Sequence, residues 1–199
     1  MQTNADTETL LTEVSRGKAA ILHGKQLIDI ILREVSHASF GQEPMSVCSI
    51  KRLILQAINQ FGFENEAMKQ RIHIKTDVDF AVRANDILFN FVIFNLLRNA
   101  IYYFDAYPES QIEIKTVKNA HENVVIFRDT GPGISEPIKK QIFDDFYSYN
   151  KSGGSGLGLS YCMRVINSFG GTIQCHSEYG QYTEFHLGFP GISNVRRSK

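Results

Sequence analysis

The sequence predicts an α+β protein whose helices and strands form two layers, preceded by one long helix. Three observations favour this fold class. A seven-residue apolar repeat runs through the first 35 residues, a long apolar segment covers 85–104, and the strand-like segments occur in neighbouring pairs. Helices and antiparallel strand pairs that each bury one face form a two-layer sandwich.

Residues 7–35 are expected to form one long helix. Val14, Ile21, Ile28 and Val35 recur every seven residues, which is the repeat of a helical-bundle seam. Two glycines inside this segment each cost about 1 kcal/mol relative to alanine. The helix therefore needs a partner, which we expect from a second copy of the chain.

The remaining elements follow from alternation, helical periodicity and turn residues. Helices are predicted at 50–61, 85–104 and 155–169, and strands at 71–75, 111–117, 123–127, 172–177 and 182–189. These boundaries divide the chain into a bundle helix (1–40), a hinge (41–45), a globular domain (46–190) and a flexible tail (191–199).

The composition argues against several kinds of partner. Twenty-one Lys and Arg balance 21 Asp and Glu, so nothing favours nucleic acid or an anionic membrane. The longest apolar run, Ile87–Leu97, is too short to cross a bilayer, and membrane contact is expected only through a parent protein. Three cysteines without a CxxC motif fit a cytoplasmic location.

Four glycines stand close together at positions 153, 154, 156 and 158, directly before a helix-capable sequence. Backbone N–H groups at a helix N-terminus bind anions, and glycine lets a phosphate approach the backbone closely. The segment therefore suits a phosphate loop, although an ordinary turn has the same composition.

Asn95 and Asn99 are four residues apart and share one face of the apolar helix. Amides buried on such a face need partners. A phosphate-bound Mg²⁺ ion would supply them, because Mg²⁺ prefers oxygen ligands. A pair of bridging amides within the core is the alternative interpretation.

Two further clusters follow along the chain. Asp129 ends a strand before two glycines, where its carboxylate can accept a hydrogen bond from an amino group, as it can in an ordinary turn. Phe143 and Phe146 bracket two aspartates before the polar stretch 147–152. That stretch has the character of a mobile lid, whereas the phenylalanines also suit a core at helical spacing.

In this order and spacing, the four clusters resemble the N box, first glycine box, F box and second glycine box of the GHKL superfamily. The resemblance is greatest to the histidine kinases of two-component signalling, and it covers roughly residues 46–190. It implies an α/β sandwich with helices on one face of a mixed sheet, and ATP and Mg²⁺ as ligands.

The resemblance also implies residue roles. Asn99 would coordinate Mg²⁺, Asn95 would act beside the phosphates, and Asp129 would accept from the adenine amine. Further nucleotide contacts are implied for Tyr103, Gly131, Gly133, Ile134, Phe146, Lys151, Gly154, Gly156, Leu157, Gly158, Leu159 and Thr183. Tyr102 stands where many relatives carry a lysine, so Lys151 or Arg98 is expected to supply that charge.

The amide at Asn95 favours phosphoryl transfer over hydrolysis. Gyrase-, MutL- and Hsp90-type ATPases of the superfamily carry a glutamate at this position, and an amide cannot act as a general base at neutral pH. We therefore predict a protein-histidine kinase. A GHKL-type ATPase and a non-enzymatic nucleotide-binding or dimerisation module are the alternatives.

The long helix resembles the second helix of the kinase dimerisation and phosphotransfer hairpin. His23 lies on it, but no acidic residue follows as it does after the family's acceptor histidine. We therefore expect the acceptor helix to be absent from this chain. The resemblance implies homodimerisation through the helical region and a response regulator as partner. Residues 26–29 and the compact lid also resemble bacterial quorum-sensing hybrid kinases.

Overall fold

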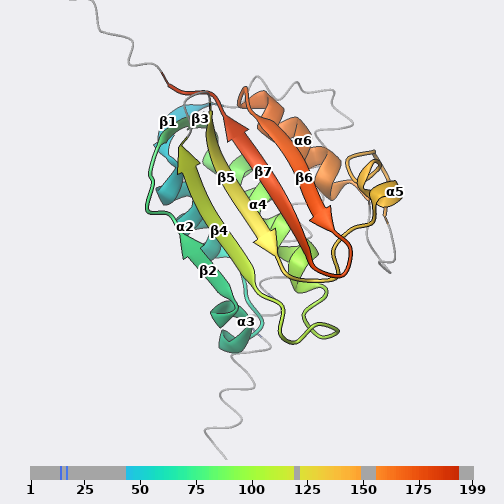
Figure 1. The fold of residues 1–199 in the computed structure, drawn as a ribbon. Helices are drawn as coiled ribbons and strands as arrows, with labels where there is room; N and C mark the ends of the chain where they lie inside the picture. The colour runs from blue at the N-terminus through green and yellow to red at the C-terminus, as the bar shows by residue number, and fades with distance from the viewer. Residues whose placement is uncertain (1–13, 15–16, 18–43, 119–121, 149–155, 193–199) are drawn as a thin grey trace, which may run out of the picture.

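The computed structural model describes residues 44–118, 122–148 and 156–192, and two isolated positions, Val14 and Gly17. Apart from these two positions, the predicted bundle helix lies outside the described residues, as do His23, most of the hinge, Lys151 and Gly154. In the described part, a sheet carries its main helices on one face (Figure 1).

The strands are β1 (Ser46–Ser49), β2 (Ile72–Lys75), β3 (Ala81–Ala84), β4 (Ile112–Lys118), β5 (Asn123–Asp129), β6 (Thr172–Glu178) and β7 (Tyr182–Phe189). The helices are α2 (Ile50–Gln60), α3 (Glu66–Gln70), α4 (Asp86–Ile101), α5 (Glu136–Lys139) and α6 (Gly158–Ser168). No helix in the described ranges combines the length and hydrophobicity that a membrane crossing needs.

The main sheet has the strand order β2-β4-β5-β7-β6. Strands β2 and β4 are parallel, and the other neighbours are antiparallel. Strands β1 and β3 form a separate antiparallel pair. The mixed sheet with helices on one face confirms the predicted α+β two-layer sandwich.

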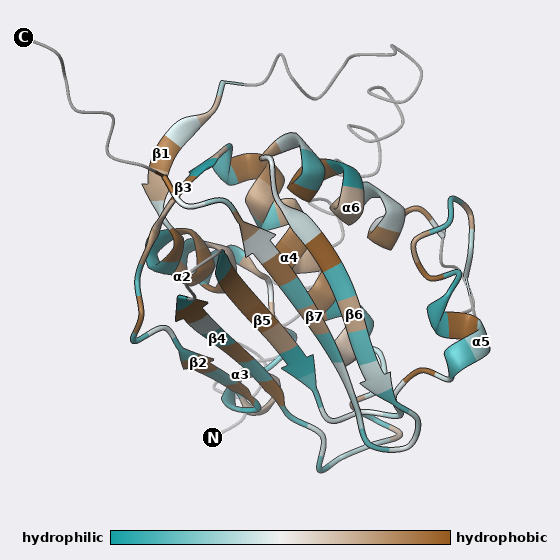
Figure 2. Cartoon of the chain, turned by 45° about the horizontal axis from the view of Figure 1, so that its top comes forward, coloured by the Kyte–Doolittle hydropathy of each residue, from teal (hydrophilic) through white to brown (hydrophobic). Residues whose placement is uncertain are grey.

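The core lies between this sheet and helices α2, α4 and α6. Helix α4 is apolar around most of its circumference and is buried along most of its length. The strands alternate instead: on β4, Ile112 and Ile114 are fully buried, while Glu113 and Lys115 are not. Figure 2 shows this alternation as bands of opposite hydropathy along the strands. Residues in phase with the buried positions must face the helices.

Helices α2 and α4 each begin at a residue whose side chain caps the helix. The Ser49 hydroxyl accepts from the Arg52 N–H at 3.1 Å and starts α2. The Asn85 side chain accepts from the Leu88 N–H at 3.0 Å and donates to the Pro44 carbonyl at 3.1 Å. Such caps satisfy N–H groups that lack a partner within the helix, and Asn85 also ties α4 to the start of the domain.

The structure corrects several predicted boundaries. The last helix begins at Gly158 rather than at 155, because Gly156 has a φ of +70°, which a right-handed helix does not allow. Helix α4 ends at Ile101, so Tyr103 lies in the turn after it. Strands β1 and β3 and helices α3 and α5 were not predicted, because each is short and neither SVCS of β1 nor AVRA of β3 alternates regularly between apolar and polar residues as IHIK of β2 does.

Candidate functional site

Asp129 is the last residue of β5 and lies on the helix-facing side of the sheet. It is in phase with the buried Val125 and Phe127, and only 7% of it is exposed. Its register partner on β7 is Thr183, which is also buried. The two predicted adenine contacts therefore stand side by side on the face that α4 and α6 cover.

The turn after β5 is built around the Asp129 carboxylate. Its Oδ1 accepts from the Gly131 N–H at 3.0 Å. A Cβ added to Gly131 would lie 2.9 Å from that oxygen and 3.9 Å from the Cβ of Tyr103. The structure thus brings Asp129, Gly131 and Tyr103 together, and a buried carboxylate, which when ionised only accepts hydrogen bonds, suits an amino group as ligand.

The β6–β7 hairpin holds the other end of this turn. The Ile134 N–H donates to the Ser177 hydroxyl at 2.8 Å, and the Gly180 N–H donates to the Pro132 carbonyl at 2.6 Å. Gly133 has a φ of +66°, and an added Cβ would lie 2.1 Å from the Glu178 carbonyl oxygen. The glycine is therefore required both by conformation and by close backbone contact.

Asn95 lies on α4 where that helix meets the N-terminus of α6. Its amide nitrogen donates to the Phe91 carbonyl at 2.9 Å. Its Oδ1 would stand 2.7 Å from a Cβ on Gly158, the first residue of α6. Leu157, the N-cap of α6, provides no side-chain cap, and Leu159 packs against the core. A helix N-terminus without such a cap suits an anionic ligand.

Asn99 and Arg98 lie on the last turn of α4. Asn99 is half-buried and four residues beyond Asn95, so the two amides share one helix face. Arg98 is exposed. Desolvation lowers the pKa of its guanidinium, whose ordinary value is high enough to keep it cationic at neutral pH. Arg98 can therefore supply positive charge near this face.

The segment before the glycine loop ends in a strained residue. Phe146 is 75% exposed and has a φ of +63°, which costs a non-glycine residue about 1–2 kcal/mol. Gly156 packs against it so closely that an added Cβ would lie 2.3 Å from the Phe146 carbonyl carbon. Phe143 instead packs beside Phe185, with ring centroids 6.3 Å apart. The core interpretation thus holds for Phe143 but not for Phe146.

Asp145 anchors this segment to α6. Its carboxylate accepts from Arg164 at 2.8 Å. Hydrogen bonds from Ser160 and Arg164 lower the pKa of Asp145. Asp145 belongs to the phenylalanine cluster of the sequence analysis, but its contacts with Ser160 and Arg164 were missed, since they join segments 15 to 19 positions apart.

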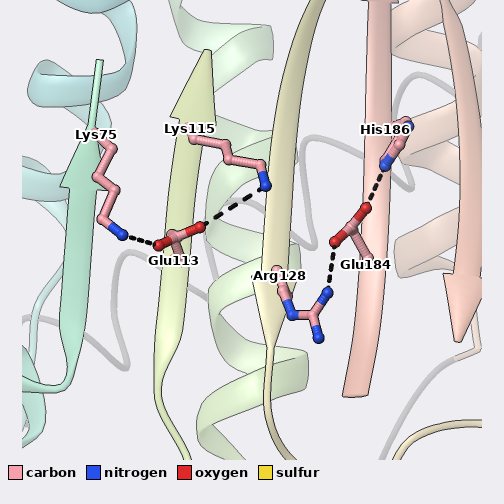
Figure 3. Close-up of polar contacts among 6 residues, drawn as sticks. All are labelled: Lys75, Glu113, Lys115, Arg128, Glu184 and His186. Carbon is pink, nitrogen blue, oxygen red and sulfur yellow. Dashed lines mark hydrogen bonds and ion pairs between the residues drawn. The ribbon is translucent and has the colours of Figure 1, made fainter. Parts of the chain in front are cut away.

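The opposite face of the sheet carries paired charges. Glu113 binds Lys75 and lies 3.9 Å from Lys115, while Glu184 binds Arg128 at 3.0 Å and also His186 (Figure 3). An open hollow of about 400 Å³ on this face is lined by His73, Lys75, Gln111, Glu113, Arg128 and Thr130. None of the predicted site residues lines it, so the candidate site is on the helix side.

The described residues could hold a metal ion only if a bound polyphosphate supplied most of its ligands. Across the described ranges, no group of three or more His, Cys, Asp or Glu side chains could hold a metal ion. Asn99 offers a neutral amide oxygen, and Mg²⁺ commonly takes few protein ligands and completes its shell with phosphate oxygens and water. The donor set therefore fits a Mg²⁺ ion that arrives with a polyphosphate.

The fold and this site define the chain's class. It belongs to the family of histidine kinase-, DNA gyrase B- and HSP90-like ATPases, whose sequence profile matches residues 84–192. That match includes every predicted nucleotide contact, from Asn95 to Thr183. The predicted type of ATP-binding domain is confirmed, whereas the individual residue roles remain predictions.

Two curated relatives and one solved structure are closely similar. The autoinducer 1 sensor kinase/phosphatase LuxN of Vibrio campbellii is 55% identical over 100% of this chain and 23% of its own length. The CAI-1 autoinducer sensor kinase/phosphatase CqsS of Vibrio cholerae is 34% identical over 85% of this chain and 24% of its own. The catalytic domain of histidine kinase ThkA aligns with a TM-score of 0.62 and 28% identity, covering 74% of this chain and 96% of that domain. The chain thus spans about a quarter of the curated relatives' length.

Proposed function

We propose that this chain is the ATP-binding catalytic region of a sensor histidine kinase that responds to an autoinducer. In this proposal ATP binds on the helix side of the sheet, with its adenine amine at Asp129 and its phosphates between Asn95, Asn99 and the N-terminus of α6. The γ-phosphoryl group is transferred to a histidine on a dimerisation helix and then to a response-regulator aspartate. The region acts as part of a homodimer at the cytoplasmic side of its parent protein.

The observation that carries the proposal is the placement of Asn95. Its amide nitrogen is bound to the Phe91 carbonyl, and its oxygen faces the start of α6, where a Cβ at position 158 would lie 2.7 Å from it. An amide in this place cannot deprotonate water at neutral pH. Transfer to a protein acceptor is therefore favoured over hydrolysis.

The other predicted contacts have defined tasks. Asn99 would ligate Mg²⁺, which when bound neutralises charge on the phosphates. Arg98 and Lys151 would add positive charge, and Lys151 lies outside the described residues. Tyr103 and Thr183 would line the base beside Asp129.

Nucleotide selectivity tests the base site. Calorimetry should show Mg²⁺-dependent ATP and ADP binding, and GTP binding weaker by about tenfold or more, because the guanine carbonyl cannot donate to Asp129 and the lost hydrogen bond should cost about 1–3 kcal/mol. Asp129→Asn should weaken ATP binding and remove the preference. Asp77→Asn, at an exposed aspartate, is the matched control. Equal affinities for ATP and GTP in the unmodified protein would contradict the role of Asp129.

Phosphoryl transfer tests the kinase assignment. The chain is mixed with labelled ATP and with the dimerisation hairpin of the Vibrio campbellii relative. Label on the hairpin, lost when its acceptor histidine is replaced, is the expected result. ATP binding without any transfer would favour a non-enzymatic nucleotide-binding module, and steady ATP turnover that Asn95→Ala abolishes would favour a GHKL-type ATPase.

A further inference from the structure

Arg71 makes an unusual concentration of contacts with one connection of the chain. It follows α3 and precedes β2. Its Nε donates to the Ser110 carbonyl at 2.8 Å, and its Nη2 donates to the Tyr107 carbonyl at 2.7 Å and to the Ser110 hydroxyl at 2.8 Å. Its Nη1 donates to the Phe104 carbonyl at 3.4 Å. The guanidinium carbon also lies 3.5 Å from the centroid of the Phe104 ring.

All of these acceptors belong to the connection between α4 and β4, residues 102–111. This connection contains no strand or regular helix, and its internal backbone bonds are few, such as Tyr107 N–H to Tyr103 carbonyl at 2.9 Å. Carbonyls outside regular structure need other donors when they are shielded from water. The planar fork of Arg71 supplies several at once.

The backbone of Arg71 is itself fixed. Its carbonyl accepts from the Ile112 N–H at 2.9 Å, directly beside the first paired residues of β2 and β4, Ile72 and Ile112. The guanidinium therefore extends from a point that the main sheet holds. Through it, the sheet determines where the connection after α4 lies.

The start of this connection forms one wall of the predicted base site. The Tyr103 Cβ is 3.9 Å from the position of a Cβ on Gly131, beside the Asp129 carboxylate. The Tyr103 ring lies 5.0 Å from that of Tyr102 and 6.5 Å from that of Tyr107, centroid to centroid. Arg71 holds the carbonyls of Phe104 and Tyr107, which follow Tyr103 closely on the chain.

We propose that Arg71 is a positioning residue for nucleotide binding, and that it acts through Tyr103. The inference rests on the proposed function, since it assumes that ATP binds beside Asp129. Arg71 acts on the connection itself, through the carbonyls of Phe104 and Tyr107. It holds the connection so that the Tyr103 side chain is placed against Gly131 before the nucleotide arrives, which avoids ordering that wall on binding.

The test compares MgATP affinities of the full chain by calorimetry. Arg71→Lys keeps the charge but replaces the planar fork with a single ammonium group. We expect it to weaken MgATP binding by about fivefold to tenfold, since an ordered wall is lost. Arg83→Lys, on the exposed side of β3, is the matched control and should leave the affinity unchanged.

A double-mutant cycle separates positioning from a general loss of stability. In a Tyr103→Ala background, Arg71→Lys should have little further effect on MgATP affinity, because the residue through which it acts is gone. The chain has eight tyrosines and no tryptophan, so the part of its tyrosine fluorescence that Tyr103→Ala removes reports on Tyr103. The change that MgATP causes in that part should be smaller in Arg71→Lys.

Several outcomes would overturn the inference. Equal affinity in Arg71→Lys and the unmodified protein would do so, as would the same loss with and without Tyr103. If circular dichroism shows that Arg71→Lys does not fold, Ser110→Ala is measured instead; it removes only the hydroxyl contact, and unchanged affinity in that variant overturns the inference too. No MgATP binding by the unmodified protein overturns the proposed function itself, which distinguishes the two failures.

Discussion

The side-chain oxygen of Asn95 lies only 2.7 Å from the place that a Cβ on Gly158 would occupy. Asn95 is fixed from the other side, because its amide nitrogen donates to the Phe91 carbonyl at 2.9 Å within α4. The contact joins the centre of the most buried helix to the first residue of α6. The absence of a side chain at Gly158 therefore sets how closely the amide and the helix N-terminus approach.

Gly158→Ala should lower stability, although alanine in a helix is normally favoured over glycine by about 1 kcal/mol. The added methyl group must displace either the Asn95 side chain or the start of α6. We expect a loss of about 1–3 kcal/mol in urea unfolding and weaker MgATP binding. Gly191→Ala, where an added Cβ would meet nothing within 4 Å, should be nearly neutral.

Asn95→Ala should partly restore the stability of Gly158→Ala. A favourable coupling in this double-mutant cycle follows if the amide oxygen is what the methyl group meets. Purely additive effects on the free energy of unfolding would show that a contact other than the one with the Asn95 oxygen limits how closely the N-terminus of α6 approaches α4.

The sequence predicted the parts of the fold that depend on local periodicity. The apolar segment 85–104 became α4 and the alternating pair 172–177 and 182–189 became β6 and β7, with boundaries shifted by a few residues. The strands β1 and β3 were missed, since SVCS and AVRA do not alternate between apolar and polar residues as the equally short β2 does. Their pairing depends on partners more than 30 residues away.

The candidate site was predictable where a motif carries the chemistry. Asp129 and the glycines around it form such a motif, and the structure places them together with Thr183. Ser177 and Arg71 were not predictable in this way. Ser177 contacts Ile134, 43 residues earlier, and Arg71 contacts Ser110, 39 residues later, so no local pattern marks either residue.

Gly156→Ala should be more harmful than its backbone conformation alone explains. Its φ of +70° imposes a penalty on any side chain of about 1 kcal/mol, and an added Cβ would also lie 2.3 Å from the Phe146 carbonyl carbon. Gly180→Ala is a matched control, because Gly180 has a φ of +82° but an added Cβ there meets nothing within 4 Å.

Thermal unfolding and MgATP titration of the two variants isolate the contact with Phe146. We expect Gly156→Ala to lower the melting temperature further than Gly180→Ala and to weaken MgATP binding, whereas Gly180→Ala should bind normally. Identical losses in both variants would mean that the contact between Gly156 and Phe146 contributes nothing.

Asn95→Ala should reduce MgATP affinity and phosphoryl transfer without removing any hydrolytic activity. The amide cannot activate water, so slow background hydrolysis should be the same with and without it. Phosphate release measured over hours gives the rate of hydrolysis, and label transferred to a histidine-bearing hairpin gives the rate of phosphoryl transfer. Asn90→Ala is a useful control, because Asn90 is a buried amide of the same helix that instead donates to Gln60 at 2.8 Å; it should lose stability and retain transfer per folded molecule.

Cys175 should make the protein less stable at alkaline pH. Burial raises the pKa of its thiol to about 12, against about 8.5 in an unfolded chain. Above pH 8.5 the unfolded state therefore loses a proton that the folded state keeps, and the free energy of unfolding falls as pH rises toward 12. At neutral pH the thiol is protonated in both the folded and the unfolded state, so it does not make the free energy of unfolding depend on pH there.

Alkylation and unfolding measurements check this behaviour. At pH 8 iodoacetamide should modify Cys175 slowly in the folded protein and rapidly in denaturant, since only the thiolate reacts. Between pH 7 and pH 9.5, Cys175→Ala should lose less stability than the unmodified protein, because it removes one of the groups whose ionisation favours unfolding. Rapid alkylation of folded Cys175 at pH 8, with far-ultraviolet circular dichroism unchanged, would mean that the thiol is not shielded between β6 and the helices as the structure has it.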